Sequence, residues 1–185
     1  MEKADIKEQI LIFGKARSNL LAVIIFTIIN LFLTFFNTGV NFLFSATLPQ
    51  VIFEIFKGAN FEIESNILLI IGLILAIIII IPYFIFWILA KRIRVFILVA
   101  LIYFSIDSGI LLFFIFSTEF DVLFLLDIAF HGWILYYLIN GVKAWYKIRD
   151  VDSELYYTIL QEIKPKGIKP MELPNDKNKW NIFRK

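Results

Sequence analysis

This chain of 185 residues contains no cysteine, and histidine occurs once, as His131. The absence of cysteine excludes disulfides, thiolate metal sites and thiol nucleophiles. With a single histidine, the chain has neither an HExxH pattern nor a second imidazole to complete a metal centre of that kind. We therefore expect no cofactor and no bound metal.

Hydrophobic residues make up 60% of the chain, and the mean hydropathy is +0.82. Soluble domains are usually about half apolar, so this excess indicates a membrane protein. A helix needs about 20 apolar residues to cross the hydrocarbon core of a bilayer. Four segments satisfy this requirement, at residues 19–36, 66–90, 95–116 and 122–145. The first is too long for the apolar core of a cleavable signal peptide, so we interpret it as a retained span.

Basic residues are distributed unevenly around these four segments. Of the 18 Lys and Arg residues, all but Lys57 lie before the first span, between the second and third, or at and after the end of the fourth. Positively charged flanks are typical of the cytoplasmic side of a membrane. The sequence therefore predicts that both termini are cytoplasmic and that the chain resides in the cell membrane.

The predicted fold class is all-α, a polytopic membrane four-helix bundle with both termini cytoplasmic and with short interfacial helices. Residues 1–149 form the four-span membrane domain in this interpretation. Residues 150–185 form a cytoplasmic amphipathic helix and a mobile tail that is rich in proline and charge.

Three shorter segments have helical features outside the spans. Residues 4–13 predict an amphipathic helix on the inner membrane surface that ends at Gly14. After Pro49, the segment VIFEIF predicts either a helix in the outer interface or a re-entrant turn buried against protein. In the C-terminal helix, the predicted apolar face consists of Val151, Leu155, Ile159 and Ile163.

Three ionisable side chains lie within the predicted spans: Asp107, Asp127 and His131. Such groups are costly in hydrocarbon and usually face the interior of a helical bundle. A short outer turn joins spans three and four, and at 1.5 Å per residue Asp107 and His131 both lie about 13 Å deep. Asp127 lies one turn nearer the outer surface, on the same face as His131. We expect the three side chains to meet.

The first span carries a polar stripe, because Thr27, Asn30 and Thr34 recur at helical spacing and Asn37 continues the pattern. By the same depth count, this stripe is level with the three ionisable residues. The candidate polar cluster in the outer half of the bundle therefore comprises Asp107, Asp127, His131, Asn30, Thr27 and Thr34. The inner half is almost wholly apolar, which disfavours an ion channel, because a channel needs polar lining on both sides of the midplane.

The cluster is open to four interpretations. In the first it is a structural tie, in which Asp107 completes a contact between Asp127 and His131 and locks two helices together. In the second it is a proton-responsive site, because histidine titrates near neutral pH. In the third, His131 and the two carboxylates hold a divalent metal. In the fourth, Ser105 or Ser108 acts as the nucleophile of a hydrolase.

Four strings occur in this order along the chain: ARSNLLAVIIFTIINLFL, FLFSATLP, FSIDSG and DIAFHGWILYYLINGVKA. With them, residues 16–147 resemble a type of small four-span membrane protein seen in low-GC Gram-positive bacteria. The resemblance implies the four-span fold and a cell-membrane location, but it implies no activity and no functional residue.

The hypothesis that best accommodates these patterns is a non-enzymatic interaction or accessory subunit. Its expected partners are the lipid bilayer and either another membrane protein or a second copy of the chain, with no nucleic acid. An outward-facing binding or transport protein, responsive to protons or to a ligand through the polar cluster, is the alternative. A metal-dependent membrane enzyme is the third hypothesis.

Overall fold

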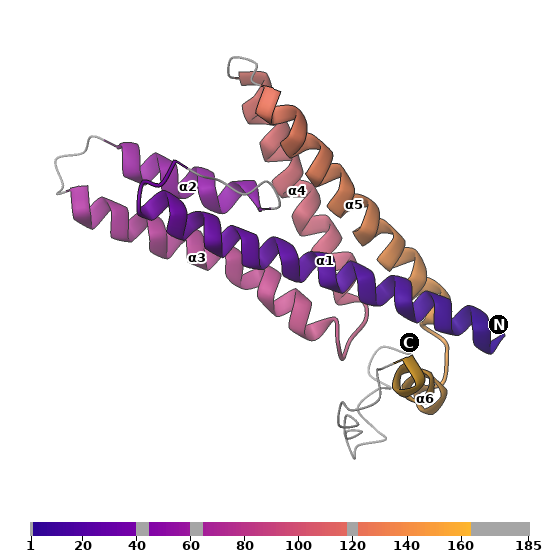
Figure 1. The fold of residues 1–185 in the computed structure, drawn as a ribbon. Helices are drawn as coiled ribbons and strands as arrows, with labels where there is room; N and C mark the ends of the chain where they lie inside the picture. Colours follow the sequence, from indigo (N-terminus) through magenta and orange to yellow (C-terminus); the bar gives the residue numbers. More distant parts are fainter. Residues whose placement is uncertain (1, 40–44, 60–64, 118–121, 164–185) are drawn as a thin grey trace.

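The computed structural model describes residues 2–39, 45–59, 65–117 and 122–163 (Figure 1). Within these ranges the regular structure is helical, and no strand occurs. The helices are α1 (Lys3–Phe35), α2 (Thr47–Gly58), α3 (Ser65–Leu89), α4 (Phe96–Ser117), α5 (Val122–Ile148) and α6 (Ser153–Ile163). The predicted all-α fold is confirmed.

Four of these helices, α1, α3, α4 and α5, are long and apolar enough to cross a membrane. They coincide with the four predicted spans to within a few residues, except at the start of α1. However, they do not run as one parallel bundle along their whole length. The α4–α5 hairpin diverges from α1 and α3 toward the end that is far from the start of α1 (Figure 1). The helix α2, which contacts α1, α3 and α4, begins where the two groups separate.

The prediction of a separate N-terminal surface helix that ends at Gly14 is wrong. One helix runs without interruption over Lys3–Phe35, and Gly14 does not have a positive φ. A glycine inside a helix costs about 1 kcal/mol relative to alanine, which is too little to end a helix that tertiary contacts stabilise. Those contacts come from Ile6, Ile10 and Phe13, which are all buried.

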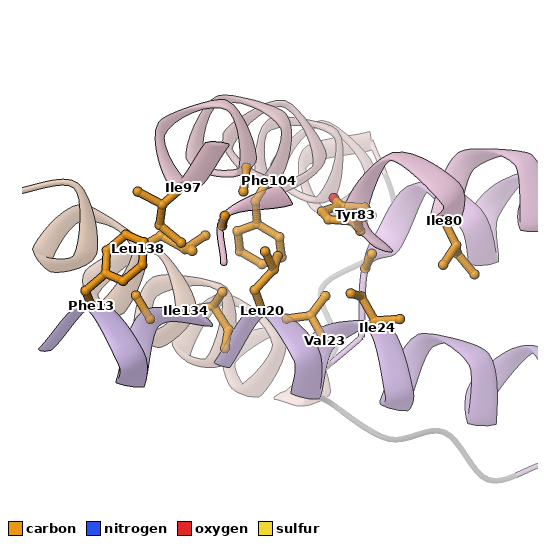
Figure 2. Close-up of a cluster of buried hydrophobic side chains, with 14 of the residues drawn as sticks. Phe13, Leu20, Val23, Ile24, Ile80, Tyr83, Ile97, Phe104, Ile134 and Leu138 are labelled. Atoms are coloured by element: carbon orange, nitrogen blue, oxygen red, sulfur yellow. The ribbon is translucent and has the colours of Figure 1, made fainter. Parts of the chain in front are cut away.

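The main core lies between the long helices (Figure 2). Leu20 of α1, Phe104 of α4 and Leu138 of α5 are each at most 1% exposed. The helices α1 and α5 lie close together at Gly141, where an added Cβ would collide with the Cβ of Ala16. Small residues at such a crossing allow two backbones to come together, as is common between membrane helices.

The helix α6 packs against the first turns of α1 and the end of α5. Tyr156 and Ile159 form a small core there with Ile10 and Ile148. Arg94, in the turn between α3 and α4, donates from Nη1 to the Ile148 carbonyl at 2.7 Å and lies over the Tyr156 ring. The start of α1 and the whole of α6 therefore lie at the same end of the protein.

The apolar face predicted for α6 is partly wrong. Leu155 is 40% exposed, whereas Tyr156, outside the predicted face, is 8% exposed. A tyrosine buries a large apolar ring, and the packing of that ring beneath Arg94 rotates the buried face toward Tyr156. Burial raises the pKa of the Tyr156 phenol, and the nearby Arg94 guanidinium opposes this rise.

The structure also decides between the two conformations predicted for the segment after Pro49. This proline does not interrupt the segment, because it lies in the first turn of α2, where a proline is tolerated. The helix packs along α3, where an added Cβ at Gly72 would lie 2.6 Å from the Cβ of Phe56. Phe53 is fully buried. The segment is therefore a helix packed against protein, with its N-terminus inside the fold.

Candidate functional site

Asp107 lies at the middle of α4 and is 2% exposed. Its Oδ2 accepts a hydrogen bond from the backbone N–H of Thr47 at 2.9 Å, and its Oδ1 accepts one from Leu48 at 2.8 Å. These are the first two N–H groups of α2, and such groups have no partner within their own helix. The carboxylate therefore caps α2 from another helix, and its negative charge lies at the positive end of the α2 dipole.

The residues just before α2 are paired by α1. Thr27 Oγ1 accepts a hydrogen bond from the N–H of Ala46 at 2.8 Å, while its own hydroxyl donates back to an α1 carbonyl. Asn30 Nδ2 donates to Ser45 Oγ at 2.8 Å. Pro49 occupies the third position of α2 and has no N–H that needs a partner. Two other helices thus supply the hydrogen bonds that an alanine N-cap does not provide.

His131 of α5 completes this cluster and is 5% exposed. Its Nδ1 lies 3.0 Å from the backbone carbonyl oxygen of Asp127 and must donate to it, because a carbonyl only accepts. Its Nε2 faces Oγ1 of Thr47 at 3.3 Å and Oδ2 of Asp107 at 3.4 Å. The imidazole also stacks on Phe104, with 5.1 Å between the ring centroids. With a proton on both nitrogens, the imidazolium forms a buried ion pair with Asp107.

Four of the six predicted cluster residues meet around the start of α2: Asp107, His131, Asn30 and Thr27. The other two do not join them through their side chains. Asp127 contributes its backbone carbonyl, and its carboxylate forms no hydrogen bond with any described residue. Thr34 lies near the end of α1, where its carbonyl accepts a hydrogen bond from Nζ of Lys57 at 2.8 Å. Asn37, beyond the end of α1, is exposed, with φ of 56°.

Sequence reasoning does not place Ser45 or Thr47 in the cluster, although both hydrogen-bond to its members. One signal points to them, because a proline in the first turn marks a helix start just before it, and Pro49 follows Thr47 by two residues. Tyr83 of α3 was also missed. It is 1% exposed, it packs edge-on against Phe104, and its hydroxyl has no hydrogen-bond partner among the described residues.

The geometry differs from that of a catalytic triad. In a triad, the nucleophile and the carboxylate contact opposite nitrogens of the imidazole. Here Thr47 and Asp107 both face Nε2 of His131. The hydroxyls of Ser105 and Ser108 each donate to a carbonyl of their own helix, four residues earlier.

The donor set also differs from that of a metal centre. In the part of the chain that the structure describes, no group of three or more His, Asp and Glu side chains has the arrangement of a metal site. Asp107 already accepts two backbone N–H groups, so its lone pairs are directed at α2. The cluster therefore holds the polar N-terminus of α2 among apolar helices. No family model, curated protein or solved structure matches this chain.

Proposed function

We propose that this protein is a non-enzymatic interaction or accessory subunit of the cell membrane, with both termini cytoplasmic. It binds a transmembrane helix of another membrane protein, or of a second copy, through the exposed face of α5. One observation carries the proposal. The α5 span has the lowest mean hydropathy of the four, 1.3 against 2.1 to 3.2, and is also the least buried, at 22% against 28 to 33%. A span that faces only lipid should be the most apolar, so this mismatch indicates a missing protein neighbour.

Five exposed residues of α5 lie on one helical face together with the half-buried Asn140, and we call this the α5 face. Its members recur at spacings of three and four residues: Leu125, Ala129, Gly132, Tyr136, Asn140 and Lys143. Tyr136 is 64% exposed, and neither its hydroxyl nor the amide of Asn140 forms a hydrogen bond within the described residues. Hydrocarbon offers no partner to such groups, whereas a second helix does.

The small residues of the α5 face, Ala129 and Gly132, are exposed in the described structure. An added Cβ at Gly132 would meet nothing within 4 Å, whereas Gly141 on the opposite side of α5 packs against Ala16. Ala129, one turn before Gly132, is also exposed. Small side chains allow a neighbouring helix to approach closely, and the polar groups farther along the face then supply hydrogen bonds.

Because the chain contains no cysteine, a single introduced cysteine is the only thiol that a crosslinking reagent can label. An Ala129→Cys variant, labelled with a photoreactive maleimide in native membranes, is expected to give a discrete adduct in high yield upon illumination. The mass of the adduct distinguishes a second copy from a different protein. Replacing Tyr136 by Phe and Asn140 by Leu in the same chain is expected to reduce the adduct several-fold, because the interhelical hydrogen bonds are lost.

The matched control is Ile74→Cys on α3, a position that is 52% exposed and similarly deep in its span. It is expected to give only a weak smear of adducts from random collisions. Equal yields from positions 129 and 74 would show that α5 has no preferred neighbour, and would rule out the α5 face as a docking surface.

A further inference from the structure

A groove of about 660 Å³ opens where α1, α5 and α6 meet, at the end of the protein that carries the start of α1. It lies apart from the polar cluster at the start of α2. Its walls include Gly14, Lys15 and Ser18 of α1, Trp133 and Tyr137 of α5, and Leu160 of α6. Cationic, aromatic and apolar residues line it, and none of its described lining residues is acidic.

The two ends of the groove differ in chemistry. Because Gly141 packs against Ala16, Lys15 is level with the last turns of α5, and Trp133 lies about 12–14 Å farther into the membrane by helical rise. The end nearest the termini therefore presents the ammonium of Lys15, the hydroxyl of Ser18 and the amide of Asn19. The deep end presents the indole ring of Trp133, which is 53% exposed.

Arg17 adds a second cation to the polar end. Its Nη2 donates to the Trp87 carbonyl at 3.2 Å, and the guanidinium lies 5.7 Å from the centre of the Trp87 ring. Its Nε is buried and has no hydrogen-bond partner among the described residues. Arg17 is thus positioned by α3, while Lys15 is exposed at the groove. Two positive charges at this end of a membrane span attract anionic lipid.

We infer that this groove binds one anionic phospholipid from the leaflet next to the start of α1. Its headgroup phosphate pairs with Lys15 and Arg17, and one acyl chain lies along Tyr137 and Trp133 toward the middle of the membrane. An anionic phospholipid carries its negative charge at one end and is apolar over the rest of its length. Its charged end matches the cationic end of the groove, and its acyl chains match the aromatic end. Aromatic residues in this part of a membrane protein pack well against lipid.

Gly14 gives a direct way to fill the groove. It lines the groove wall, and an added Cβ there would meet nothing within 4 Å. A Gly14→Phe variant therefore extends a ring from an open position on the groove wall, and it replaces a poor helix former. Lys15→Gln removes the exposed charge and leaves the shape of the groove unchanged. Lys7→Gln, on an exposed turn of the same helix outside the groove, makes the same change of charge and is the control.

The test is lipid retention by the full chain, measured by native mass spectrometry from detergent micelles doped with equal amounts of phosphatidylglycerol and phosphatidylcholine. We expect one phosphatidylglycerol to be retained at saturation, severalfold more tightly than phosphatidylcholine. Lys15→Gln should weaken its binding about fivefold, the effect of one basic residue at a membrane surface. Gly14→Phe should abolish it, and Lys7→Gln should leave it unchanged.

Four results would overturn the inference. Equal retention of the two lipids would remove the role of charge. Retention that survives Gly14→Phe, or that falls equally in Lys7→Gln and Lys15→Gln, would show general electrostatic attraction in place of a groove. Displacement of the lipid by millimolar inorganic phosphate would show that a free anion is the ligand. The circular dichroism of each variant, expected to match that of the parent chain, establishes that loss of lipid is not loss of fold.

Discussion

Asp107→Ala is expected to free the N-terminus of α2 and to destabilise the protein by about 2–4 kcal/mol. The substitution leaves the half-buried N–H groups of Thr47 and Leu48 without an acceptor and removes the carboxylate partner of His131. A buried donor that loses its partner costs about 1–3 kcal/mol, and two are lost here. Asp107→Asn should cost less, because one carboxamide oxygen still accepts while the amide nitrogen faces an N–H donor.

Two measurements check this result in detergent-solubilised protein. The free energy of unfolding should fall in the order parent, Asp107→Asn, Asp107→Ala. Because Ala46 is fully buried, the thiol of an Ala46→Cys variant should be inert in the parent chain. It should react with maleimide once Asp107 is also replaced by alanine. The second measurement reports on α2 itself, so it separates release of this helix from a general loss of stability.

Asp127→Ala is the matched control, because it removes the other carboxylate of the predicted cluster. Its carboxylate forms no hydrogen bond with any described residue, and only its backbone carbonyl, which alanine retains, accepts from His131. We expect an effect within about 0.5 kcal/mol, as for substitutions away from buried networks. If the two alanine variants proved equally destabilised, the assignment of Asp107 as the cap of α2 would be untenable.

Gly141→Ala is expected to destabilise the protein by about 1–3 kcal/mol, although alanine is the better helix former. Its Cβ would collide with the Cβ of Ala16, which is fully buried on α1. Neither atom belongs to a flexible side chain that rotates away, so the two helices must separate. Their separation also loosens the contacts that Leu138 makes in the core. Gly141→Leu should be more disruptive still.

The control lies on the same helix. Gly132→Ala adds the same methyl group where nothing lies within 4 Å, so it should be neutral or slightly stabilising in the isolated protein. Thermal unfolding of both variants, with Ala16→Gly tested as a rescue of Gly141→Ala, provides the measurement. The rescue should recover most of the lost stability, because it removes the opposing methyl group. A Gly141→Ala protein as stable as Gly132→Ala would mean that α1 and α5 do not cross at this point.

The long helices could be read from the chain, because each is a continuous apolar run of a length that only a membrane helix accounts for. The meeting of Asp107 with His131 was also predictable, because depth along a straight helix follows from residue count alone. The end of the N-terminal helix at Gly14 was predicted wrongly. Local propensity contributes about 1 kcal/mol there, and burial of Ile6, Ile10 and Phe13 outweighs it.

The polar stripe of α1 also shows which features follow from the sequence and which follow from packing. Thr27 and Asn30 are buried in the cluster. Thr34 lies one turn farther on, and its backbone carbonyl accepts a hydrogen bond from Lys57. Helical periodicity places all three on one side of α1, but it does not say which of them another segment covers. That depends on where α2 starts, and this start lies between α1 and α4.

By itself, the sequence determined the all-α class, the four apolar helices and the positions of the polar residues along them, because composition and periodicity act along one helix at a time. Only the tertiary structure decided what the polar residues do. The α2 N-terminus has no capping side chain of its own, and Ala46 in that position gives no local sign of one. The acceptors come from Thr27 and Asp107, which are 19 and 60 residues away from their partners in the chain. Hydrogen bonds across such separations become visible only when the helices that carry them are packed.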